Sequence, residues 1–396
     1  MPGPGAFLFG KEEADAAMEV LQKGYLFRYG SEDDPSFLHK VYSLEKEFAD
    51  YCGSDYALAT TSGTASLLVS LKALGLKPSD EIVVPAYTFV ASYSSCIFAG
   101  LVPVLAEIDD SLTIDPEDIE RRITPLTKAI MPVHMLGNPC KMDEIMKIAK
   151  KHNLFILEDS CQALGATYKG KKVGTIGNIG AFSLNIFKTI NSGDGGLVVT
   201  NDKQLYEKAF GFHDQGHKPL RTGVEVGDRD TIGLNFRMSE LTAAVALAQL
   251  RKADVIISIL REKRKKFKTL IASIDGIKFR TLNDPDGDCA TLCTVIFDSA
   301  EKALKVCKAL GTKTVDHSGW HVYSNMEHIL HHFKQIGRPH AKGAYPKTDD
   351  LLSRAVNISV GVVDGGLGAG WGINILSSDK EIENAADQFI QAFKNE

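Results

Sequence analysis

Lys188 is the residue of this sequence whose setting most clearly predicts chemistry. It follows an apolar run and precedes a glycine-rich turn, and residues 181–196 read AFSLNIFKTINSGDGG. Apolar surroundings disfavour the charged form of a lysine, so its pKa falls and the free amine becomes a nucleophile that can condense with an aldehyde. An isolated lysine is more often a surface residue. The interpretation therefore depends on other segments.

Two other segments supply groups that an aldehyde cofactor with a phosphate and a pyridine ring requires. Ser62, Gly63 and Thr64 form a small turn before an apolar run, and such a turn at the start of a helix offers backbone N–H groups to an anion. Asp159 ends a short apolar strand pattern, where a carboxylate can hold a protonated pyridine nitrogen. An ordinary helix cap explains the first segment equally well when it is taken alone.

These segments, taken together and in this order, resemble the DegT/DnrJ/StrS family of sugar aminotransferases, which are fold-type I enzymes that use pyridoxal 5′-phosphate (PLP). Several matching motifs in order carry far more weight than any one of them. The resemblance extends over residues 26–250 and becomes thin beyond them. Its motifs are SGTA at 62–65, PAYTFVAS at 85–92, EDSCQALG at 158–165, FS at 182–183 with Lys188 and GDGG at 193–196, and GLNFRM at 233–238.

The resemblance implies an α/β fold of the aspartate aminotransferase type, with a mixed, mostly parallel sheet in a large domain and a smaller C-terminal α+β domain. We expect an N-terminal arm and helix over residues 1–30, the large domain over residues 31–250, and a linking helix and the small domain over residues 251–396. A chain of 396 residues is long enough for two domains. Alternating strand and helix patterns agree with a parallel sheet covered on both faces.

The resemblance also assigns roles to the residues at the matched positions. Lys188 would hold PLP covalently, Asp159 would bind the ring nitrogen, and Phe89 would stack on the ring. Asn235 would reach the cofactor phosphate of a partner subunit, so that a homodimer shares its active sites. Core packing is the alternative interpretation for Phe89, and capping of its own helix is the alternative for Asn235. The remaining cofactor contacts would come from Ser62, Gly63, Thr64, Gln162 and Ser183.

The reaction implied by the resemblance is a transamination in which PLP and its pyridoxamine form alternate, with L-glutamate as the expected donor. The acceptor would be a keto or aldehydo sugar, carried on a nucleotide, free, phosphorylated, or present as a sugar acid such as an 8-oxo-octulosonate. The segment GYLFRY at residues 24–29 is similar to enzymes that aminate the terminal carbon of that acid. Two alternatives stay open: a PLP-dependent sugar dehydratase, whose relatives replace the lysine by histidine, and a non-catalytic relative that keeps the fold.

Basic side chains outside the cofactor motifs further favour an acidic acceptor. Arg28, His317, His321 and Arg354 are candidate contacts for a carboxylate or a phosphate. A surface ion pair explains Arg28 at least equally well. The segments around residues 316–323 and 354–371 depart from the family pattern, so the resemblance specifies the reaction rather than the substrate.

Composition limits the expected partners and compartment. A formal net charge of -5 provides no basic surface for nucleic acid or an anionic membrane. The seven cysteines are scattered without the spacing of a zinc site, so we expect no metal centre and buried free thiols in a reducing compartment. The N-terminal residues MPGPGA resemble no secretion signal. The cytoplasm is therefore the expected location.

Overall fold

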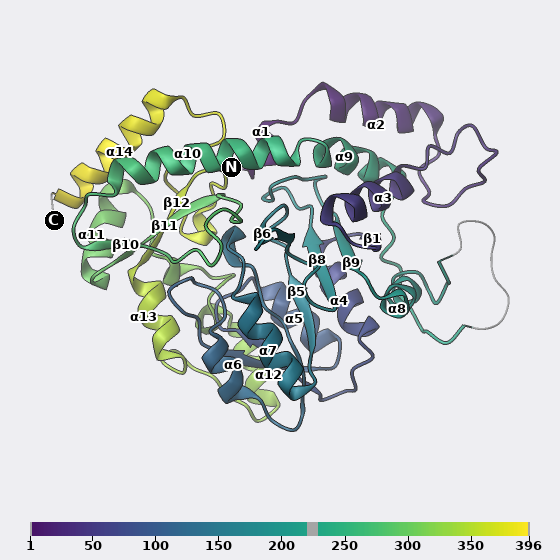
Figure 1. Cartoon of the computed structure of the whole chain (residues 1–396), viewed down its shortest axis with the longest axis horizontal. Helices are drawn as coiled ribbons and strands as arrows, with labels where there is room; N and C mark the ends of the chain where they lie inside the picture. Colours follow the sequence, from purple (N-terminus) through teal and green to yellow (C-terminus); the bar gives the residue numbers. More distant parts are fainter. Residues whose placement is uncertain (1, 220–228, 395–396) are drawn as a thin grey trace.

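The computed structural model describes residues 2–219 and 229–394 and is built around one large sheet (Figure 1). Seven strands form this sheet in the order β1-β9-β8-β5-β4-β2-β3. Strand β9 runs antiparallel to β1 and β8, whereas the other neighbours pair in parallel, as predicted for a mixed, mostly parallel sheet. The strands are β1 (Tyr56–Thr60), β2 (Glu81–Pro85), β3 (Val102–Ala106), β4 (Thr127–Ile130), β5 (Phe155–Asp159), β8 (Ile179–Ser183) and β9 (Gly196–Thr200).

Helices cover both faces of this sheet, because successive side chains of a strand point to opposite sides. In β1, Leu58 enters one core, whereas Ala57 and Ala59 enter another. Helices α4, α5 and α8 contribute to the core on the first face, and α3, α6 and α7 to the cores on the second. These helices are α3 (Lys40–Cys52), α4 (Gly63–Ala73), α5 (Val90–Phe98), α6 (Pro116–Arg122), α7 (Met142–His152) and α8 (Lys203–His213).

A smaller antiparallel sheet, in the order β10-β11-β12, follows two consecutive helices, α9 and α10. Helix α14 packs on α10 and on α11, and together they cover this sheet. This is the α+β arrangement expected of the C-terminal part, while the domain boundaries near residues 30 and 250 stay predictions. The elements are α9 (Glu240–Leu250), α10 (Ala253–Ile271), β10 (Ile277–Phe279), β11 (Leu292–Phe297), α11 (Ala300–Leu310), β12 (Ala355–Ser359) and α14 (Asp379–Lys394).

Between α11 and β12 the chain returns to the large sheet, a path that the sequence did not indicate. The backbone N–H groups of Thr88 and Val90 donate to the carbonyl oxygens of His321 and Trp320, each at 2.9 Å. Further along, side chains from helices α12 (Glu327–Gln335) and α13 (Pro346–Arg354) are buried in the same core as α5. This segment therefore holds His321 and Trp320 directly beside the segment that carries Phe89.

The N-terminal arm packs against the loop that carries Lys188. The N–H group of Gly3 donates to the carbonyl oxygen of Ile186 at 2.9 Å. A Cβ atom at Gly5 would lie 2.8 Å from the carbonyl oxygen of Thr189, so this contact requires glycine. The arm, which contains helices α1 (Pro4–Phe7) and α2 (Lys11–Lys23), therefore supports the lysine loop from outside.

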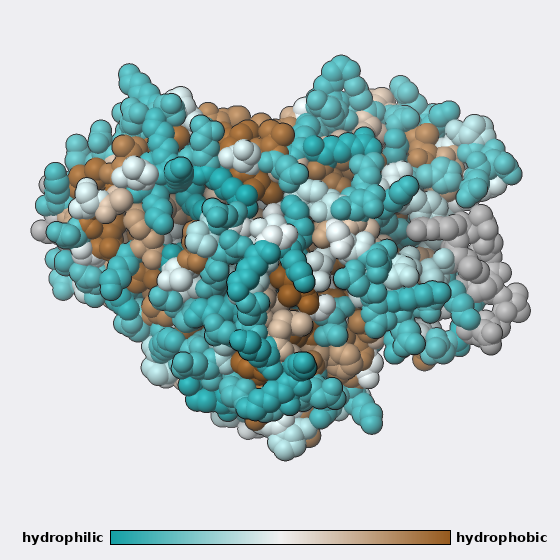
Figure 2. Space-filling view, in the orientation of Figure 1, coloured by the Kyte–Doolittle hydropathy of each residue, from teal (hydrophilic) through white to brown (hydrophobic). Residues whose placement is uncertain are grey.

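The surface is mostly polar on the face drawn in Figure 2, and apolar side chains gather along its upper edge, over α1 and the adjoining part of α10. Large apolar side chains are also exposed in α2 and directly after it, at Met18, Leu21, Leu26 and Phe27. Such exposed apolar groups mark a surface that another protein can cover. Within the described residues, every helix is too short or too polar to span a bilayer.

Candidate active site

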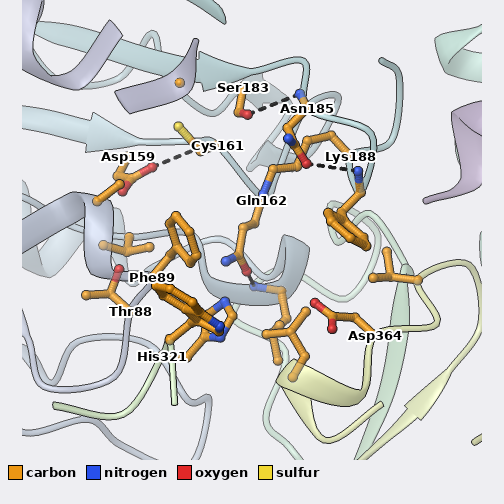
Figure 3. A pocket seen from close by; sticks show the side chains of 18 of the residues that line it. Thr88, Phe89, Asp159, Cys161, Gln162, Ser183, Asn185, Lys188, His321 and Asp364 are labelled. Atoms are coloured by element: carbon orange, nitrogen blue, oxygen red, sulfur yellow. Dashed lines mark hydrogen bonds between the residues drawn. The ribbon is translucent and has the colours of Figure 1, made fainter. Parts of the chain in front are cut away.

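A cavity of about 580 Å³ opens where the parallel strands of the large sheet end. Residues that follow β1, β5 and β8 line it, together with residues from the C-terminal part of the chain. Open α/β sheets bind ligands at the carboxyl ends of their strands. Of the predicted site residues, those that line the cavity are Ser62, Gly63, Thr64, Phe89, Asp159, Gln162, Ser183, Lys188 and His321. Figure 3 labels Phe89, Asp159, Gln162, Ser183, Lys188 and His321 around it.

Lys188 extends into the cavity from the turn between β8 and β9 (Figure 3). Its backbone N–H group donates to the carbonyl oxygen of Asn185 at 2.9 Å, which fixes the turn. Burial lowers the pKa of the Lys188 amine, and the nearby acidic groups of Cys161, Asp159 and Asp364 offset only part of this effect. The amine is therefore neutral at a lower pH than that of an ordinary lysine and is a better nucleophile.

Asp159 is the last residue of β5 and is 4% exposed. Its Oδ2 accepts a hydrogen bond from the Ser92 hydroxyl at 2.8 Å, and its Oδ1 accepts one from the backbone N–H of Cys161 at 3.1 Å. The Ser92 hydroxyl lies 2.7 Å from that of Thr88. These bonds fix the carboxylate and leave lone pairs for one more donor, so Asp159 suits a protonated ring nitrogen.

The N-terminus of α4 opens on the same cavity. Ser62 caps the helix, because its hydroxyl oxygen accepts the backbone N–H of Ala65 at 3.1 Å. A Cβ atom at Gly63 would lie 2.6 Å from the Cβ of Ser183, so glycine lets the helix start against the end of β8. The first N–H groups of a helix, together with its dipole, bind anions such as a phosphate.

Phe89, Trp320 and His321 form an aromatic wall of the cavity. The Phe89 ring lies 5.3 Å from the His321 ring and 6.5 Å from the Trp320 ring, measured between centroids. Phe89 is 38% exposed, so it offers a ring face to a flat ligand. Burial, with the charge of Lys188, lowers the pKa of His321 to about 3. His321 is therefore neutral near pH 7 and carries no charge that would attract an acidic group.

Gln162 and Ser183 keep donor groups for a ligand. The Oε1 of Gln162 accepts the backbone N–H of Leu136 at 3.1 Å, which leaves its amide N–H groups for the cavity. The Oγ of Ser183 accepts the backbone N–H of Asn185 at 3.3 Å, so the hydroxyl proton is available to an acceptor. Both positions agree with contacts to a bound cofactor.

The sequence comparison decides the family. The model of the DegT/DnrJ/EryC1/StrS aminotransferase family matches residues 9–363, a range that contains both Lys188 and Asp159. The chain belongs to this family.

Relatives and solved structures agree with this assignment. The chain is 42% identical to the GDP-perosamine synthase of Escherichia coli O157:H7 over 59% of this chain and 64% of that protein, which is less than two thirds of its length. It is 35% identical to the spore coat polysaccharide biosynthesis protein SpsC of Bacillus subtilis over 68% of this chain and 69% of that protein. The aminotransferase from Psychrobacter cryohalolentis, 28% identical, superimposes with a TM-score of 0.83 over 100% of this chain and 99% of that chain.

The DegT/DnrJ/EryC1/StrS aminotransferases imply PLP, and the residues of the cavity fit this cofactor. Lys188 offers an amine for the aldehyde, and Asp159 offers an oriented carboxylate for the ring nitrogen. The N-terminus of α4, with Gly63 at its first position, offers N–H groups for the phosphate. Phe89 adds an apolar surface for the ring.

Asn235 was also predicted to contact the cofactor. It does not line the cavity of its own chain. Its side chain is exposed, and its Oδ1 accepts the backbone N–H of Arg237 at 3.2 Å. Ser239 rather than Asn235 caps helix α9, so the helix-cap interpretation is wrong. The role of Asn235 in a partner's site stays a prediction.

Arg28 is a core residue and does not reach the cavity, so its expected contact with the substrate needs correction. Its Nη2 donates to Glu45 at 2.9 Å and its Nη1 donates to His213 at 2.9 Å, with the side chain fully buried. Glu45 also accepts the backbone N–H of Ala59 at 2.9 Å. Burial and the Arg28 charge lower the pKa of His213 to about 3, so His213 is neutral and can accept this bond. Arg28 and Glu45 thus form an ion pair in the core, whereas the alternative interpretation of Arg28 was an ion pair on the surface.

His317 and Arg354 also lie away from the cavity wall, contrary to expectation. His317 is exposed and its Nδ1 lies 2.9 Å from a carboxylate oxygen of Asp316. Arg354 pairs with Asp350 within its own helix and donates to the carbonyl oxygen of Phe297 at 2.8 Å. Of the four basic residues expected to meet an acidic acceptor, His321 alone lines the cavity.

The structure adds Thr88, Asp194, Trp320 and Asp364 to the predicted wall. Thr88 and Asp194 belong to motifs that carry the family resemblance, and Trp320 lies in a segment that departs from the family pattern. Their places in these segments could have predicted that they line the site. Asp364 is the charged residue of the glycine-rich stretch at 363–371, and a lone charge among glycines could have indicated a site residue.

We expect Lys188 to react with an amine-selective reagent at a lower pH than other lysines. A lowered pKa increases the neutral fraction of the amine at every pH below it, so the rate of modification rises earlier. Labelling of protein freed of cofactor across a pH series, quantified by peptide mass spectrometry, measures this. Lys11, whose pKa its partner Asp15 raises, is the matched control. Equal midpoints for the two lysines would contradict the lowered pKa.

We expect Arg28→Leu to destabilise the fold by about 3–5 kcal/mol, because it removes the guanidinium that balances the charge of the buried Glu45 carboxylate. Urea unfolding followed by circular dichroism gives the free energy of unfolding. Lys11→Leu breaks an exposed pair with Asp15 and should leave that free energy almost unchanged. A similar small effect for both variants would show that the internal pair is not important for stability.

Proposed function

We propose that this protein is a PLP-dependent transaminase that moves an amino group from L-glutamate to a carbonyl-bearing sugar. The observation that carries the proposal is the convergence of Lys188, Asp159 and the N-terminus of α4 on one cavity. Membership of an aminotransferase family supports the reaction class. A dehydratase is disfavoured, because its relatives would have histidine where this chain has Lys188.

The chain's own residues have separate tasks in this reaction. PLP, when bound, supplies an electron sink for the carbon that loses or gains the amino group. The Nζ of Lys188, with its lowered pKa, would accept the proton of the donor's alpha carbon and pass it to the cofactor carbon that carries the aldehyde, and the reverse would occur with the acceptor. Asp159 keeps the ring nitrogen protonated, and the amide of Gln162 orients polar groups without adding charge. Apolar side chains at Leu67 and Val133 reduce access of water to the reacting atoms.

The acceptor has two candidates. The printed names of relatives, such as GDP-perosamine synthase, support a sugar carried on a nucleotide. The segment at residues 24–29 supports an aldehydo sugar acid such as an 8-oxo-octulosonate. The basic side chains that favoured the acid lie outside the described cavity wall or are neutral, whereas Asp194 and Asp364 line it. The charge of the described wall therefore favours an acceptor that is neutral where it enters this cavity.

We propose further that two copies of the chain assemble and share their active sites. Asn235 is exposed and follows a segment with exposed apolar side chains at Ile232 and Leu234. Ile186 and Phe187, beside the catalytic lysine, are also exposed. A second copy would bury these groups. Asn235 would then reach the neighbouring cavity.

We expect Lys188→Ala to abolish amino transfer and the borohydride-stable link to PLP, because Lys188 is the one lysine among the described residues that line the cavity. The assay supplies L-glutamate with a panel of nucleotide-linked keto sugars, sugar phosphates, free keto sugars and 8-oxo-octulosonate. Lys11→Ala, in an exposed ion pair, is the control and should retain wild-type turnover. Full activity of Lys188→Ala, or no transfer by the wild type to any member of the panel, would contradict the proposed function.

We expect Asn235→Ala and Lys188→Ala chains to complement each other when they are unfolded, mixed and refolded together. A hybrid dimer would contain one site with both residues, so an equal mixture should recover about a quarter of wild-type turnover if pairing is random. The control mixes Lys188→Ala with a chain that carries both substitutions, and it should stay inactive. Normal turnover of Asn235→Ala alone would contradict the role of Asn235, and an impaired Asn235→Ala that recovers no turnover when mixed with Lys188→Ala would contradict a shared site.

A further inference from the structure

Asp364 presents a carboxylate to the cavity from outside the family motifs. It follows β12 in the C-terminal part of the chain and lines the same cavity as Lys188 and Gln162. Figure 3 draws it across the hollow from Asp159, the carboxylate assigned to the cofactor ring. The match of the family model ends at residue 363, so Asp364 lies one residue beyond the matched range. The mechanism assigns it no task.

Hydrogen bonds hold Asp364 in a tight turn. Its backbone carbonyl accepts the N–H groups of Leu367 at 3.1 Å and Ala369 at 2.9 Å. The turn is fixed to the adjoining strand, because the Asn357 side chain donates to the carbonyl oxygen of Leu367 at 2.8 Å. It is also fixed to the end of α11, where the Thr312 hydroxyl donates to the carbonyl oxygen of Gly368 at 3.1 Å. The position of the carboxylate is therefore set before any ligand binds.

The turn uses one of the two carboxylate oxygens of Asp364. Its Oδ1 accepts the backbone N–H of Gly366 at 2.8 Å. Throughout the described part of the chain, no lysine, arginine or histidine lies within ion-pair distance of Asp364. The second oxygen, on a residue that lines the cavity, is therefore available to donors of a ligand.

We propose that Asp364 is a specificity-determining residue that accepts hydrogen bonds from hydroxyl groups of the acceptor sugar and disfavours an anionic group at that position. Sugars present many hydroxyl donors, and a hydrogen bond to an ionised acceptor is stronger than one between neutral groups. A carboxylate or phosphate at the same place would meet a like charge in a partly desolvated cavity. The inference rests on the proposed function, because it assumes that a sugar enters this cavity.

The two half-reactions should respond differently to loss of this charge. L-Glutamate brings carboxylates, which Asp364 repels, whereas the sugar brings hydroxyl groups, which Asp364 binds. Removing the charge should therefore weaken binding of a neutral acceptor without weakening binding of the donor. A purely structural role for Asp364 predicts equal effects on both.

Asp364→Asn is the decisive variant, because the asparagine oxygen can still accept the N–H of Gly366 and so preserves the turn. We expect the KM for a neutral keto sugar on a nucleoside diphosphate to rise about tenfold, with kcat changed less. The KM for L-glutamate, measured from the absorbance change of the cofactor in the donor half-reaction, should stay the same or fall. The ratio of kcat/KM for 8-oxo-octulosonate to that for the neutral sugar should rise.

Asp350→Asn removes an equal charge outside the cavity wall, where Asp350 pairs with Arg354, and is the matched control. Thermal unfolding and the PLP absorbance band identify any variant that has lost its fold or its cofactor. If Asp364→Asn is poorly folded, Asp364→Glu keeps the charge, and recovery of neutral-sugar selectivity in it supports the proposal. Unchanged acceptor KM in a folded Asp364→Asn, or equal increases for donor and acceptor, would overturn it.

Calorimetric binding separates this inference from the proposed function. If the wild type transfers an amino group to no sugar of the panel, the proposed function fails, but binding of the neutral nucleotide-linked sugar to the holoenzyme still tests Asp364. About tenfold weaker binding in Asp364→Asn than in the wild type and in Asp350→Asn supports the inference. Equal binding by all three proteins, or no binding by the wild type, overturns it.

Discussion

The candidate site depends on one constraint: the start of helix α4 must lie directly against the end of the strand that leads to Lys188. This approach is possible because Gly63 and Gly196 have no side chains. A Cβ atom at Gly63 would lie 2.6 Å from the Cβ of Ser183, and one at Gly196 would lie 2.5 Å from the carbonyl oxygen of Ser62. The helix N-terminus, which suits a phosphate, and Lys188, which suits an aldehyde, thereby line the same cavity.

The sheet topology alone brings the other side chains to this cavity. Parallel strands end at a common edge, so Asp159 at the end of β5 faces the same cavity as the residues after β1 and β8. The N-terminal arm then supports the lysine loop from outside through Gly3 and Gly5. The residues that line the cavity thus come from elements distant in sequence, and the sheet topology brings them together.

Sequence reasoning worked where the information is local. The short apolar run that ends at Asp159 predicted β5 correctly, and motif positions predicted Lys188 and Asp159 on the cavity. It failed where a residue's partner is far along the chain. Arg28 was expected at the substrate, but Glu45 and His213 hold it in the core. The return of residues 315–352 to the large sheet was likewise missed, because their apolar side chains are buried in a core that they share with α5, a partner distant in sequence.

The pairing of residues 320–323 with residues 87–90 has a mechanical consequence. Two backbone hydrogen bonds join Thr88 and Val90 to His321 and Trp320, and an isolated bridge joins Tyr87 to Val322. If the sheet of β10, β11 and β12 rotated as a rigid body against the large sheet, these hydrogen bonds would have to break, or the chain on either side of residues 320–323 would have to bend. The backbone around Phe89 and that around Trp320 and His321 would therefore move as one unit.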